Sequence, residues 1–127
     1  MKIGNIVSDW LEMSAGMPQG SYLGPLTFVI LIDSLQPACM THKYVDDTTM
    51  TEILNKSAGS CMQSFVEELV QQSTEAGMIV NGRETKEMLI GAALLKAPPP
   101  LVILNYAPVE RVATFKLLGV HVASDLK

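Results

Sequence analysis

Two adjacent aspartates, Asp46 and Asp47, constrain the fold of this chain more than any other feature of its sequence. Apolar Val45 precedes them and the β-branched and small residues of 48–51 follow, a pattern typical of two short strands joined by a tight acidic turn. Two such charges about 4 Å apart repel by roughly 1 kcal/mol in water and by roughly 4 kcal/mol at a protein-like dielectric. A divalent cation relieves this repulsion, because Mg²⁺ and similar hard ions prefer carboxylate oxygens. The alternative is a solvated turn whose aspartates bond their own backbone.

A glycine-rich loop precedes the acidic pair. Residues 16–25 read GMPQGSYLGP and lead directly into a long apolar segment. Glycine lets the backbone approach a ligand closely, and Pro18 stiffens the path of the loop. Gln19 offers a donor and an acceptor to a base, a sugar or a phosphate. On these residues alone, an ordinary connection between a strand and a helix explains the loop equally well.

The balance of charge and hydrophobicity limits the partners of the chain. Its formal net charge is −4, whereas a domain that grips a nucleic-acid backbone is expected to carry a basic patch. Autonomous binding to nucleic acid is therefore expected to be weak or absent. Hydrophobic residues make up 48% of the chain and charged residues 17%, which is more apolar surface than a small free-standing domain needs. That excess suggests missing neighbours.

The cysteines and the lack of apolar targeting segments indicate an intracellular protein, in the cytoplasm or the nucleus. Cys39 and Cys61 lack the spacing of metal ligands, and they fit reduced thiols better than a disulfide framework. The start of the chain is mixed and polar rather than a signal peptide. The longest apolar run, residues 28–32, is far shorter than a membrane span, so we expect no membrane partner.

The first part of the chain is expected to form a hairpin and a helix. Loose alternation within residues 1–15 predicts a β-hairpin. After the glycine-rich loop, a helix is expected to begin near Tyr22, with Ser21 as its cap and Pro25 in its first turn. Residues 23–35 are apolar nearly all round, so we expect this helix to be buried on most sides.

An amphipathic helix and several short strands are expected to follow. Apolar residues recur at three- and four-residue steps from Met62, which predicts a helix from Asn55 or Ser57 to about Ala76, with Gly77 as its C-terminal stop. No internal repeat or domain boundary interrupts the sequence. The predicted strands are 78–80, 85–90, 101–104, 109–112 and 115–122, with a tight turn at Asn81–Gly82 and a bulge or close backbone approach at Gly119.

Four segments resemble, in the same order, motifs of reverse transcriptases of the non-LTR (LINE-like) retrotransposon type. Residues 16–25 resemble Gly-x-Pro-Gln-Gly-x-x-Leu-Gly-Pro, and residues 44–47 resemble the Tyr-x-Asp-Asp metal-binding hairpin. Residues 77–86 are similar to Gly-Met-x-x-Asn-x-x-Lys-Thr-Lys, although Glu84 replaces the first lysine. Residues 115–120 are similar to the Phe-x-x-Leu-Gly segment that lies under the primer end.

The resemblance implies that residues 1–127 form one partial palm domain of a right-hand polymerase. This α+β domain is an antiparallel sheet backed by two helices. The fingers and the thumb are expected to be absent. The motif that carries the first catalytic aspartate is also expected to be absent, because Asp9 followed by Trp10 lacks the context of that motif. The implied enzyme is an RNA-directed DNA polymerase with an incomplete active site, so we expect the isolated chain to be inactive.

The resemblance also implies a role for individual residues. In the complete enzyme, Asp46 and Asp47 would hold Mg²⁺, or Mn²⁺ in its place, for transfer of a dNTP to a DNA primer on an RNA template. Lys86 would act on the leaving pyrophosphate. The remaining implied contacts are with nucleotide or template, through Pro18, Gln19, Gly20 and Tyr44, and with the primer, through Leu118 and Gly119.

Two other interpretations stay open on the sequence. A palm remnant without catalytic activity would bind a protein partner through surface that the lost subdomains once covered. An unrelated small α+β domain would use the acidic turn to bind calcium. Both alternatives retain the acidic turn but remove the polymerase reaction.

Overall fold

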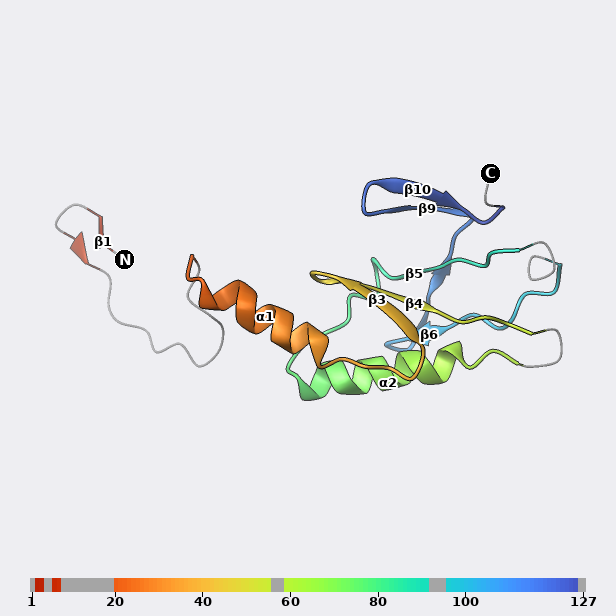
Figure 1. Ribbon diagram of the computed structural model, residues 1–127, viewed down its shortest axis with the longest axis horizontal. Coiled ribbons are helices and arrows are strands. Elements are labelled where there is room, and N and C mark those ends of the chain that lie inside the picture. Colours follow the sequence, from red (N-terminus) through yellow and green to blue (C-terminus); the bar gives the residue numbers. More distant parts are fainter. Residues whose placement is uncertain (1, 4–5, 8–19, 56–58, 92–95, 126–127) are drawn as a thin grey trace.

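The computed structural model describes residues 2–3, 6–7, 20–55, 59–91 and 96–125. Within these ranges the chain is an α+β protein, as predicted (Figure 1). Of the hairpin predicted within residues 1–15, the described residues form a short antiparallel pair, and the remainder lies outside the described ranges. The elements in chain order are β1 (Lys2–Ile3), β2 (Ile6–Val7), α1 (Leu23–Asp33), β3 (Met40–Tyr44), β4 (Asp47–Thr51), α2 (Met62–Glu75), β5 (Lys86–Glu87), β6 (Ile103–Leu104), β7 (Ala107–Pro108), β8 (Glu110–Arg111), β9 (Thr114–Leu117) and β10 (Val120–Ala123).

The strands pair differently from the single antiparallel sheet that we expected. In the described ranges they form five two-stranded sheets, of which β5–β8 is parallel and the other four are antiparallel hairpins. Segment 78–80 forms no strand, and the strand predicted over 85–90 is reduced to the two residues of β5. Many of these strands are only two residues long. Each therefore offers few backbone N–H and C=O groups with which a third strand could form hydrogen bonds and extend the sheet.

Helix α1 is the element that differs most from expectation. Ser21 caps it as predicted, because its Oγ accepts a hydrogen bond from the Gly24 N–H at 3.3 Å, and Pro25 lies in the first turn. However, none of its residues is buried, and Figure 1 shows the helix extending away from the strands that follow it in the chain. The prediction of burial on most sides was therefore wrong. No helix in the described part of the chain is long and apolar enough to cross a lipid bilayer.

Helix α2 is amphipathic, as its periodicity predicts, and it buries Val66, Leu69 and Ser73. It begins at Met62 rather than at Asn55 or Ser57, because the Glu52 carboxylate accepts hydrogen bonds from the Cys61 N–H and the Ser60 hydroxyl, both at 2.7 Å. That carboxylate caps the helix from a distant part of the chain. At the other end, Gly77 has a φ of 72°, which confirms it as the stop.

The hydrophobic core lies between α2 and the hairpin β6–β7. Its buried residues are Val66, Val102, Leu104 and Val109. Gln63 of α2 reinforces this contact with two hydrogen bonds to one residue of β6: the Ile103 N–H donates to Gln63 Oε1 at 2.7 Å, and Gln63 Nε2 donates to the Ile103 carbonyl at 3.1 Å. The side-chain amide thus satisfies both backbone groups that a neighbouring strand would otherwise pair.

Candidate functional site

The acidic pair lies at the end of a regular antiparallel hairpin, as predicted. β3 and β4 pair over five positions, from Met40 with Thr51 to Tyr44 with Asp47. Val45 and Asp46 form the turn between the strands, so Tyr44, Asp46 and Asp47 come together at its tip. Both aspartates are exposed. The hairpin therefore presents two neighbouring carboxylates to solvent.

Val45 has a backbone conformation that is unusual for its residue type. Its φ is 54°, in the left-handed region that β-branched residues rarely adopt. Such a conformation costs on the order of 1–3 kcal/mol, and it persists only where surrounding structure imposes it. Here the paired strands on both sides impose it, and the strained residue directly precedes Asp46.

The aspartates have a suitable chemistry for a hard cation but an incomplete ligand set. Within the described ranges, no hydrogen bond or ion pair engages either carboxylate. The same ranges contain no group of three or more His, Cys, Asp or Glu residues that could hold a metal ion. Mg²⁺ is commonly held by one or two protein carboxylates together with water and substrate phosphates. Asp46 and Asp47 fit such a site, with further ligands supplied from elsewhere.

The glycine-rich loop is only partly described. Pro18 and Gln19 lie outside the described residues, whereas Gly20 is exposed, has a φ of 86° and stands just before α1. Lys43, one residue before Tyr44, donates hydrogen bonds to the Ile32 and Asp33 carbonyls at 2.9 and 3.2 Å. The base of the acidic tip is thus attached to the C-terminal end of α1. The 11 residues of this helix span roughly 16 Å, with Gly20 beyond the other end.

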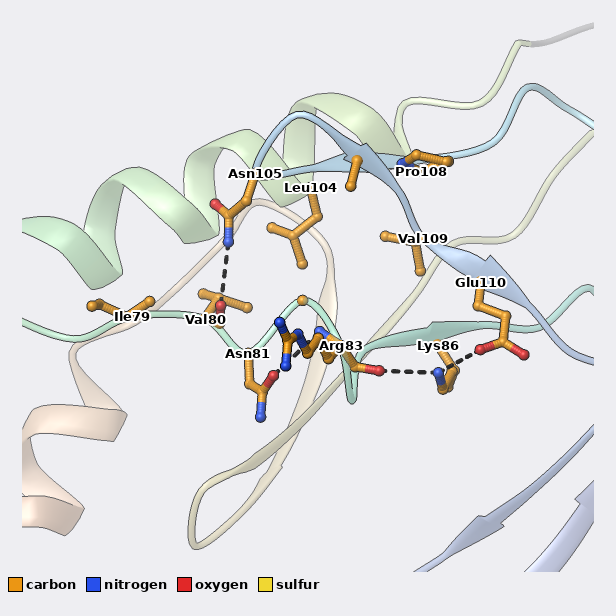
Figure 2. Close-up of a pocket in the computed structure, with 12 residues that line it drawn as sticks. Ile79, Val80, Asn81, Arg83, Lys86, Leu104, Asn105, Pro108, Val109 and Glu110 are labelled. Atoms are coloured by element: carbon orange, nitrogen blue, oxygen red, sulfur yellow. Dashed lines mark hydrogen bonds and ion pairs between the residues drawn. The ribbon is translucent and has the colours of Figure 1, made fainter.

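Lys86, the residue expected to act on pyrophosphate, is engaged in an ion pair. Its Nζ lies 2.6 Å from Glu110 Oε2 and also donates a hydrogen bond to the Arg83 carbonyl at 3.0 Å (Figure 2). The pairing follows from the parallel register of β5 and β8, in which Lys86 lies opposite Glu110. Two of the three ammonium donors are therefore used, and the charge is balanced by a carboxylate.

Sequence reasoning missed a hollow that surrounds Lys86. Its volume is about 650 Å³, and its charged lining residues are Arg83, Lys86 and Glu110. Figure 2 shows that the hollow lies between segment 79–83, β5 and the strands that follow Leu104. None of its lining residues belongs to β3 or β4. Arg83 occupies an unspecified position of the motif that residues 77–86 resemble, so nothing in the sequence was a reason to select it.

The two residues assigned to the primer form a turn. Leu118 and Gly119 join β9 to β10 with φ values of 47° and 87°, and positive φ at both central residues is typical of a type I′ hairpin turn. The expectation of one strand with a bulge at Gly119 was therefore wrong. Leu118 is 55% exposed, so the turn presents an apolar side chain to solvent.

The sequence of this chain is similar to part of a protein from a retrotransposable element. The chain is 31% identical over 126 residues to a 115 kDa protein in the type-1 retrotransposable element R1DM of Drosophila melanogaster. The similarity covers 92% of this chain, which spans 12% of the length of that relative. No protein-family model and no solved structure matches the chain. The chain is thus similar to one segment of a protein from a retrotransposable element.

Proposed function

We propose that the chain is part of the palm of an RNA-directed DNA polymerase encoded by a LINE-like retrotransposon, and that it does not polymerise alone. The observation that carries this proposal is the β3–β4 hairpin, which presents Asp46 and Asp47 at its tip without partners among the described residues. The similarity to a retrotransposon protein supports the proposed origin of the chain. That protein is far longer than this chain, which supports the proposal that the chain does not polymerise alone.

In this proposal the two carboxylates hold a divalent cation, Mg²⁺ or Mn²⁺. Such an ion neutralises phosphate charge and activates a primer hydroxyl. The Val45 turn sets the backbone position of Asp46, and Tyr44 pairs with Asp47 at the end of the hairpin. The complete protein would supply the remaining ligand, together with the surfaces that bind RNA template, DNA primer and dNTP.

Lys86 does not fit the pyrophosphate role in its present contacts. Its ammonium group would have to leave Glu110 before it met a phosphate, and the 2.6 Å ion pair opposes that movement. The exposed turn at Leu118–Gly119 fits its proposed contact with the primer, because a tightly turned backbone with an apolar side chain can lie close to a sugar or base.

A chimera of this chain with the similar Drosophila melanogaster retrotransposon protein tests the proposal. We would replace the matching segment of the retrotransposon protein by this chain and measure Mg²⁺-dependent primer extension on an RNA template. Extension is expected from the chimera and is expected to be abolished by Asp46→Asn or Asp47→Asn. The matched control is Asp33→Asn, which removes an exposed carboxylate at the end of α1 and should leave extension unchanged.

Two results would contradict the proposal. One is a chimera that extends primers equally well with both substitutions in the acidic turn. The other is an unsubstituted chimera that binds the primer–template duplex, and is therefore folded, but does not extend it.

The exposed face of α1 favours a second function, protein interaction without catalysis. Leu23, Leu26 and Ile30 are 62%, 57% and 63% exposed, and apolar patches of this kind commonly mark interaction sites. Capture of the chain by the remaining part of the retrotransposon protein tests this function. We expect Leu26→Glu to abolish capture if α1 is the contact, whereas unchanged capture would exclude that role for the helix.

A further inference from the structure

The hollow beside Lys86 has a cation that is free to bind a ligand. Glu110 neutralises Lys86, whereas no hydrogen bond or ion pair engages the Arg83 guanidinium within the described ranges. The charged lining residues are two cations and one carboxylate, so their sum is +1 in a chain whose net charge is −4. A planar guanidinium presents paired donors that match a phosphate group.

The segment that carries Arg83 is fixed by its own hydrogen bonds. Asn81 Oδ1 accepts from the Arg83 N–H at 3.2 Å, and the Asn81 carbonyl accepts from both the Thr85 N–H and the Thr85 hydroxyl at 3.0 and 2.8 Å. Asn105 Nδ2 donates to the Val80 carbonyl at 3.4 Å, which ties the segment to the β6–β7 turn (Figure 2). Arg83 thus projects from a preorganised loop, which lowers the entropy lost when it binds a ligand.

The rest of the lining suits the organic part of a ligand. The Asn81 amide nitrogen and the Asn105 amide oxygen are not used in these bonds, so one NH₂ donor group and one carbonyl acceptor group remain. A volume of about 650 Å³ is large enough for a small organic molecule, well beyond a single ion. The exposed apolar lining residues are Ile79, Ala107 and Pro108, whereas Leu104 and Val109 are each 4% exposed and belong to the hydrophobic core.

We propose that this hollow binds a small organic phosphate of the size of a nucleoside monophosphate, with Arg83 holding the phosphate group. The exposed apolar residues Ile79, Ala107 and Pro108 contact the organic body, and the two asparagine amides orient it. Glu110 limits affinity, because it neutralises Lys86 and places a carboxylate at the rim with 67% of its side chain exposed. The site is separate from the acidic turn and needs no metal ion.

Titration of the full chain with adenosine monophosphate, followed by amide chemical shifts, tests this proposal. We expect shifts concentrated at residues 79–86 and 104–110, and affinity about tenfold lower in Arg83→Gln, since one charge-assisted contact is lost. Glu110→Gln is expected to raise affinity, because it releases the Lys86 ammonium group. Lys116→Gln is the matched control: it removes an exposed cation on β9, and affinity should be unchanged.

Adenosine and inorganic phosphate separate the two halves of the ligand. Each is expected to bind more weakly than adenosine monophosphate. Equal binding of adenosine would overturn the role of Arg83, and equal binding of inorganic phosphate would overturn the role of the apolar lining. Unchanged affinity in Arg83→Gln, or shifts confined to residues 40–51, would overturn the site itself. These readouts require no polymerisation, so they are independent of the proposed function.

Discussion

The helices α1 and α2 in the described part of the chain reverse the usual relation between hydrophobicity and burial. α1 is apolar on every side, yet none of its residues is buried, whereas α2 carries a polar face and buries three residues. The difference lies in what each helix contacts. α2 faces the hydrophobic core, and its Gln63 and Gln72 bind backbone groups of other segments. α1 is held at its C-terminal end by Lys43.

The comparison shows that apolar composition alone does not determine burial. A helix is buried where another element offers a complementary surface, and the polar residues on α2 are part of that fit. Gln72 illustrates this, because its amide accepts a hydrogen bond from the Gln36 N–H at 2.7 Å and so attaches the segment between α1 and β3. In the described ranges no residue of α1 is fully buried, so full burial of its apolar residues would require a surface from outside these ranges.

The largest expected difference between the helices comes from a matched pair of leucine substitutions. Leu69→Ala in α2 removes a side chain that is 7% exposed, and we expect it to lower the free energy of unfolding by about 3 kcal/mol. Leu26→Ala in α1 removes one that is 57% exposed and should cost less than about 0.5 kcal/mol. Urea denaturation of both variants measures the difference. Equal losses would show that α1 is packed as firmly as α2.

A smaller effect is expected from the glutamine that binds β6. Gln63→Ala leaves the Ile103 N–H and carbonyl without their protein partner, and we expect a loss of about 1 kcal/mol because water reaches this exposed site. Gln71→Ala is the control, since Gln71 bonds only Glu75 of its own helix among the described contacts, and the change should stay within about 0.5 kcal/mol. Equal losses would mean that the contact across α2 and β6 adds no stability.

The smallest expected effect concerns the attachment of α1. Lys43→Met removes the ammonium group that binds the last carbonyls of the helix, and we expect a loss of about 0.5 kcal/mol, confined to the helix end. Amide hydrogen exchange at Ser34 and Leu35 should become faster, with residues of α2 unaffected. Unchanged exchange at both positions would show that Lys43 does not stabilise α1.

Features encoded by neighbouring residues could be predicted from the sequence. The acidic turn follows from the apolar and β-branched residues on either side of Asp46 and Asp47, and α2 follows from a regular spacing that ends at Gly77. The hairpin turn at Leu118 could not be predicted, because leucine rarely adopts positive φ and the pattern there reads as one continuous strand.

Features that depend on distant residues could not be predicted. Lys86 is neutralised by Glu110, 24 positions away, and only the parallel register of β5 and β8 brings them together. That no hydrogen bond or ion pair engages the Arg83 guanidinium within the described ranges is likewise visible only in the folded chain. The exposure of α1 escaped prediction for the same reason, since its sequence specifies an apolar surface but not the element that covers it.

The acidic turn is the part of the molecule on which the proposed function depends, and Mn²⁺ titration of the isolated chain tests it most directly. Paramagnetic broadening of amide signals reports which residues lie close to the bound ion. We expect broadening to begin at residues 44–48 and to disappear in the double variant Asp46→Asn, Asp47→Asn. Broadening that persists unchanged in this variant, or that centres on another part of the chain, would contradict the assignment of Asp46 and Asp47 as metal ligands.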